Sequence, residues 1–169
     1  TAWLMMRLPA FVLFFPAAGL WAFAMAALKA CEVSTCTEAA LPILPAGWHG
    51  HEMLLGYAYA VVGGYLITRP EPVRVAAAFA AWGAGRAAIL VPGMMGPPAA
   101  VLALLFPALL FLLAGVPFAR KAKKARNRVF APLIGGLAAA EAVYQIGVAG
   151  VLPGGAAPGS TRSIAMKAI

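Results

Sequence analysis

The chain has only two histidines, His49 and His51, and Glu52 and Met53 follow them directly. Imidazole and thioether groups are the side chains that hold haem iron and copper in proteins. These residues stand at the start of a long apolar stretch, where polar side chains are costly unless they serve a purpose. The segment is therefore the first candidate for a metal site, with both histidines as ligands.

The local backbone decides whether His49 and His51 can share one ion. In an α-helix, residues two apart point about 200° away from each other, whereas in an extended segment they lie on one side. Gly47 and Gly50 favour an extended start, which would bring the two rings together. A helix that begins earlier would group His49 with Glu52 and turn His51 away. Two histidines at the membrane interface with no ligand are the plain alternative.

Glu52, in the stretch that follows the histidines, and Arg86, in the next apolar stretch, are ionisable residues at similar depths. The two side chains could pair with each other, or Arg86 could bind a propionate group of haem. As a further alternative, Arg86 could extend its side chain to the lipid headgroups. Gly56, Ala60 and Gly64 form a stripe of small residues that lets another helix, or a flat cofactor, approach closely. Glu52, Arg86 and Gly56 are therefore the candidate cofactor-binding residues.

Glu141 lies near the middle of the last apolar stretch, and Tyr144 and Gln145 follow on the same helix face. A carboxyl group at that depth is expected to be protonated or hydrogen-bonded inside a bundle. Its role is either a proton relay or a structural hydrogen bond.

The composition is that of an integral membrane protein. Hydrophobic residues make up 63% of the chain and charged residues 11%, and the mean hydropathy is +0.89; soluble domains are typically about half apolar and a quarter charged. A spanning helix needs about 20 apolar residues. We therefore expect an all-α, polytopic transmembrane helix bundle that forms one domain over residues 1–169, with about five spanning helices at 9–28, 51–68, 73–91, 98–118 and 130–152.

Charge orients the predicted bundle in the membrane. Of the thirteen basic residues, six fall in Arg120–Arg128 between two apolar stretches, and such loops face the cytoplasm. The net charge of +8 is therefore not taken as a sign of nucleic-acid binding. Alternation places the loop with Cys31 and Cys36 in the periplasm, where oxidising conditions favour a disulfide between them.

Three segments resemble motifs of the NnrS family, in an order and spacing that agree over roughly residues 9–150. Trp48–Tyr57 resembles its W-H-x-H-E-M-x-x-G-aromatic motif, Gly64–Thr68 its G-F-L-L-T stretch, and Trp82–Ala88 its W-x-x-G-R-x-A stretch. The basic Ala125–Arg128 loop also stands where the family has an N-R segment. The resemblance is to the N-terminal half of the family.

The NnrS resemblance implies a polytopic protein of the bacterial inner membrane that binds haem b, copper or both. Members are linked to nitric oxide metabolism or to protection from nitrosative stress. His49 and His51 match the motif histidines, Glu52 its acid and Arg86 its arginine. The chain departs from the pattern at Glu141–Gln145, where a further histidine is expected, and it lacks the tryptophan that follows the turn after Thr68 in the family.

Other functions fit the same composition. A small, non-catalytic accessory subunit of a larger respiratory or electron-transfer complex would also have short loops and almost no soluble part. A transporter half-module that dimerises through its small-residue stripe is a third hypothesis. The sequence shows no nucleophile–base set and no phosphate loop, so it leaves open whether the protein is an enzyme. The expected partners are membrane lipid and, in the accessory-subunit hypothesis, other subunits.

Overall fold

The fold is described from a computed structural model, in which residues 9–33, 47–68, 71–91, 97–121 and 124–148 are placed. These described residues form helices and contain no strand. Five helical rods and one short helix account for nearly all of them. The elements are α2 (Ala10–Val33), α3 (Trp48–His51) continued by η1 (Glu52–Ala58) and α4 (Tyr59–Leu66), α5 (Pro72–Leu90), α6 (Pro97–Leu110) continued by η2 (Phe111–Gly115) and α7 (Val116–Lys121), α8 (Ala125–Arg128) and α9 (Phe130–Val148).

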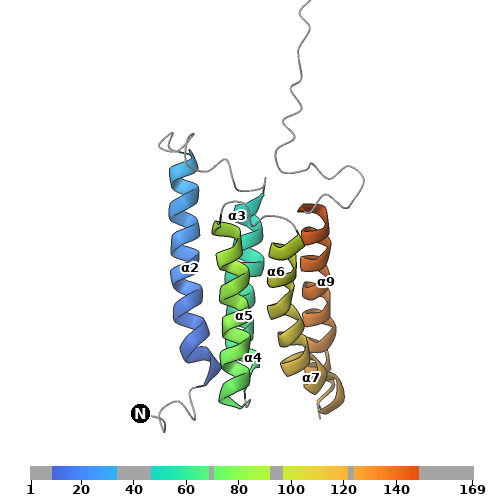
Figure 1. The fold of residues 1–169 in the computed structure, drawn as a ribbon. Helices are drawn as coiled ribbons and strands as arrows, with labels where there is room; N and C mark the ends of the chain where they lie inside the picture. Colours follow the sequence, from blue (N-terminus) through green and yellow to red (C-terminus); the bar gives the residue numbers. More distant parts are fainter. Residues whose placement is uncertain (1–8, 34–46, 69–70, 92–96, 122–123, 149–169) are drawn as a thin grey trace, which may run out of the picture.

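The rods lie side by side, and successive rods run in opposite directions (Figure 1). The closest pairs are α5 with α6, α2 with α4, and α6 with α9. The stretches η1 and η2 are π-helical, with a wider turn than an α-helix. The second of them follows Pro107, whose ring nitrogen cannot donate the usual backbone hydrogen bond.

The five predicted apolar stretches coincide with the five rods, and the all-α fold class is confirmed. Two helices, Ala10–Cys31 with 22 residues and Pro97–Arg120 with 24 residues, are long and apolar enough to cross a membrane. That all five rods cross it stays a prediction. The second rod begins three residues before the predicted position 51, and the first continues to Val33, beyond the predicted end at 28.

The greater length of the first helix changes the predicted position of Cys31. It lies in the last turn of α2 and is exposed, not in a loop as the sequence suggested. No glycine or proline follows Gly19 in this helix to end it before Cys31. Cys36 lies outside the described residues, so the disulfide stays a prediction.

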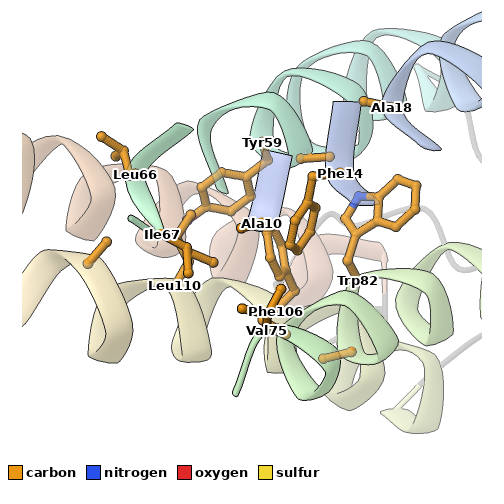
Figure 2. Packing of buried hydrophobic residues seen from close by; sticks show 14 of the residues in the cluster. Ala10, Phe14, Ala18, Tyr59, Leu66, Ile67, Val75, Trp82, Phe106 and Leu110 are labelled. Atoms are coloured by element: carbon orange, nitrogen blue, oxygen red, sulfur yellow. The ribbon is translucent and has the colours of Figure 1, made fainter. Parts of the chain in front are cut away.

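Aromatic rings from four rods fill the centre of the bundle (Figure 2). The ring of Phe14 lies 5.5 Å from Phe106 and 6.4 Å from Trp82, centroid to centroid. Tyr59 packs edge-on against Phe106 at 5.6 Å. Such tilted and edge-to-face pairs are the favourable arrangements of aromatic rings.

The outer surface of the bundle is apolar, although charged side chains are buried within it. Leu20 is 72% and Phe23 75% exposed on α2. The buried polar residues number five among those described: His51, Glu52, Arg86, Glu141 and Gln145. Membrane proteins place their few ionisable groups toward the bundle interior in this way.

The small-residue stripe on the second rod packs against α2. A Cβ atom on Gly64 would lie 2.8 Å from the ring of Phe15 and 3.0 Å from Cβ of Phe14. Close approach of the helix backbones is the common use of such stripes. At Gly64 the stripe therefore serves helix packing.

We predict that Gly85→Ala destabilises the protein. A Cβ there would lie 3.1 Å from both Cα of Ala103 and the carbonyl oxygen of Leu102, which belong to the backbone of α6 and cannot turn aside. Overpacking costs about 1–3 kcal/mol, which exceeds the gain of about 0.5–1 kcal/mol from replacing a helical glycine with alanine. Thermal unfolding in detergent measures the difference.

Gly83→Ala is the matched control on the same helix, because a Cβ there meets nothing within 4 Å. Its melting temperature should equal or exceed that of the unchanged protein. Equal melting temperatures for the two variants would contradict the close approach of α5 and α6.

Candidate functional site

The start of the second rod fixes where the two histidines point. Gly47 has a φ of 79°, a conformation that glycine adopts readily, and the helix begins at the next residue, Trp48. The amide of His51 donates to the carbonyl of Gly47 at 3.2 Å. The extended segment favoured by the sequence is therefore wrong: Gly50 lies inside the helix, where intrahelical bonds satisfy the backbone. His49 and His51 consequently face different directions.

The π-helical stretch begins at Glu52, immediately after His51. Nδ1 of His51 lies 2.8 Å from Oε1 of Glu52, so these neighbours along the chain contact each other through their side chains. Four residues on, the carbonyl oxygen of Gly56 accepts a hydrogen bond from Nε1 of Trp82 at 2.9 Å. Wide turns of this kind are frequent at functional sites.

Glu52 is 1% exposed and accepts three hydrogen bonds from outside its own helix. Nη1 of Arg86 donates to its two carboxylate oxygens at 2.7 and 2.8 Å. Nε1 of Trp21 donates to Oε2 at 3.0 Å. The pairing of Glu52 with Arg86, which the sequence allowed, is therefore present, and Arg86 does not extend to the headgroups because it is only 4% exposed.

Glu141 on α9 completes the group. Its Oε2 lies 2.9 Å from Nε2 of His51, and its Oε1 accepts a hydrogen bond from Gln145 at 2.7 Å. Nη2 of Arg86 lies 4.0 Å from Oε1. The ring of Tyr144 stacks on that of His51 with a centroid distance of 3.9 Å and an angle of 15°.

We call His51, Glu52, Arg86 and Glu141 the ion cluster. Because both ring nitrogens of His51 face carboxylate oxygens, a proton must lie in each of the two contacts. The cluster then holds either an imidazolium and two carboxylates, or an imidazole and one protonated carboxyl group. In both cases its net charge, with Arg86 included, is zero.

Sequence reasoning placed Glu141 at the middle of its helix and did not join it to the histidines. The 2.9 Å contact between its Oε2 and Nε2 of His51 shows that Glu141 faces the start of the second rod. The signal was present: Glu141, Tyr144 and Gln145 share one helix face. What the sequence did not reveal was the facing residue on another rod.

The residues of the ion cluster do not fit a metal ion or a haem group in this arrangement. Neither ring nitrogen of His51 has a lone pair available, because each contacts a carboxylate. The space beside Gly56 is filled, since a Cβ there would lie 2.8 Å from Nε1 of Trp21. Within the described ranges, no group of three or more His, Cys, Asp and Glu side chains could hold a metal ion.

His49 is different, because its Nδ1 is buried and has no hydrogen-bond partner among the residues that the structure describes. Its ring packs edge-on against Trp48 at 5.6 Å. A buried nitrogen without a partner is costly unless something binds it. Of the two predicted metal ligands, only His49 presents such an unpartnered nitrogen.

A family model described as NnrS protein matches residues 6–168, nearly the whole chain. The chain belongs to the NnrS family. Comparison with curated proteins and comparison with solved structures find no match. The motif positions of this NnrS protein lie at one end of the bundle, where His51, Glu52 and Arg86 meet and His49 stands apart from them.

We predict that Arg86→Ala strongly destabilises this NnrS protein. The change leaves the buried carboxylate of Glu52 without its closest cation, a loss that typically costs about 3–5 kcal/mol. Arg74→Ala is the control, because Arg74 pairs with Glu71 at 3.3 Å while their side chains are 59% and 72% exposed. Exposed pairs contribute about 0–1 kcal/mol. Thermal unfolding in detergent should separate the two variants clearly, and equal losses would contradict the burial of the pair.

Proposed function

We propose that this NnrS protein is an inner-membrane protein of nitric oxide or redox-stress metabolism, and that it binds haem or copper through His49. The observation that carries the proposal is the buried Nδ1 of His49, which lacks a partner although it lies two residues from the ion cluster. Family membership over residues 6–168 supports the metabolic role. Whether the protein catalyses a reaction is left open.

Imidazole suits both cofactors, because it ligates haem iron and copper. When bound, haem or copper would supply the binding of nitric oxide or the transfer of an electron. Within the described residues, His49 does not belong to a group of three or more His, Cys, Asp and Glu side chains that could hold a metal ion. His49 as a whole is partly buried, and its Nδ1 is buried.

The helix around His49 supports this role. The left-handed conformation of Gly47 fixes the direction in which the chain enters α3. The neighbouring Trp48 is buried and its ring lies against that of His49. Two residues that follow hold this part of the helix against other rods: His51 contacts Glu141 on α9, and Glu52 pairs with Arg86 on α5. The ring of His49 is thus presented from a firmly held helix end, as a ligand residue requires.

We predict that His49→Ala lowers haem or copper content at least about tenfold, because a metal site that loses a ligand loses most of its affinity. An absorption spectrum and metal analysis of the purified protein measure this. Gly50→Ala is the control for the local fold, since a Cβ there meets nothing within 4 Å. A purified protein without either cofactor, or unchanged content in the His49 variant, would refute the ligand role.

We further propose that all five rods cross the inner membrane, with Arg120–Arg128 in the cytoplasm and the end of α2 at Cys31 on the periplasmic side. The apolar outer surface of the rods supports this, because lipid favours such a surface. The bias of basic residues toward one loop supports the orientation.

We predict opposite labelling of two single-cysteine variants made after Cys31 and Cys36 are replaced by serine. Gly50→Cys and Lys124→Cys are both at exposed positions near opposite ends of the bundle. A thiol reagent that does not cross the inner membrane should label Gly50→Cys in intact cells and Lys124→Cys only after lysis. The reverse pattern would invert the orientation, and equal labelling would refute the spanning topology.

A further inference from the structure

We infer that His51 is the counter-charge of Glu141 in an electrically neutral clamp between three rods, and that it is not a metal ligand in this protein. The family resemblance matches His51 to a motif histidine and suggests a cofactor role for it. The contacts of its ring point to a different role. The inference concerns the ion cluster alone and does not depend on the proposed role of His49.

The ring of His51 is fully engaged by protein groups. Its Nδ1 lies 2.8 Å from Glu52, its Nε2 lies 2.9 Å from Glu141, and one face stacks on Tyr144. A metal ion could reach either nitrogen only by displacing a carboxylate. That displacement would break the contact by which His51 holds Glu52 at 2.8 Å or Glu141 at 2.9 Å.

The two carboxylates differ in how far they depend on His51. Glu52 also accepts hydrogen bonds from Arg86 at 2.7 and 2.8 Å and from Trp21 at 3.0 Å. Among the described residues, Glu141 has only the neutral amide of Gln145 besides His51 within hydrogen-bond distance, and Arg86 is 4.0 Å away. Without His51, Glu141 is therefore the carboxylate left without a close cation.

The cluster joins rods that are far apart in the sequence. His51 and Glu52 lie on the second rod, Arg86 on α5 and Glu141 on α9, and every one of these residues is buried. Charged hydrogen bonds are strong in surroundings of low polarity. Both carboxylates of the cluster accept hydrogen bonds, whereas Nε of Arg86 is buried without a partner among the described residues. The clamp thus fixes the relative positions of the three rods at this end of the bundle.

The test is a set of variants that remove charges in different combinations. His51→Ala leaves the cluster with one negative charge in excess, and its melting temperature in detergent should fall by roughly 6 °C or more. Adding Glu141→Gln restores neutrality and leaves the Glu52–Arg86 pair intact, so the double variant should recover most of the loss. Adding Glu52→Gln also restores neutrality, but it leaves Glu141 with Arg86 at 4.0 Å only, and it should recover much less.

The two double variants carry the same net charge, so a difference between them reports the contact of His51 with Glu141 and not overall charge. If His51→Ala yields no folded protein, recovery of folded protein with Glu141→Gln but not with Glu52→Gln gives the same support. Equal recovery, or no recovery, overturns the inference. So does loss of wild-type haem or copper from a folded His51→Ala, Glu141→Gln double variant, because that result would make His51 a ligand.

Discussion

The rest of this end of the bundle depends on the neutralisation of two carboxylates that are buried away from water. Glu52 and Glu141 are each 1% exposed, and in apolar surroundings neither can remain charged without a close cation. Nη1 of Arg86 donates a hydrogen bond to Glu52 at 2.7 Å, and the ring of His51 contacts both carboxylates. The directions of the side chains at the start of the second rod follow from this requirement.

The charge requirement also explains why the two histidines differ. His51 faces the bundle interior, where both of its nitrogens contact carboxylates. His49, two residues earlier, points elsewhere and keeps a nitrogen without a partner. Under the proposed function, the two histidines of one motif have separate roles: His51 holds the bundle together and His49 presents a ligand atom. This division reconciles the NnrS family membership with a cluster that has no room for a cofactor.

The sequence predicted those features that depend on composition and on residues close in the chain. The apolar stretches located the five rods, and matching depth suggested the pair of Glu52 and Arg86. Such reasoning could not predict the contact between His51 and Glu141. The two residues are 90 positions apart in the sequence, and their contact depends on how the second rod and α9 face each other. The π-helical turn was missed for a related reason, since its wider winding leaves no distinct pattern of apolar residues. The cofactor and the disulfide remain predictions.

The wide turn at Glu52–Ala58 also makes this part of the chain sensitive to a change in length. In an α-helix each residue turns the chain by about 100°, so removing one residue from this turn would rotate everything before it relative to the small-residue stripe behind it. Gly64 would keep its packing against Phe14 and Phe15, while His51 would turn away from α9. The wide turn sets the rotation about the helix axis between Gly64, which packs against α2, and His51, which contacts the carboxylates.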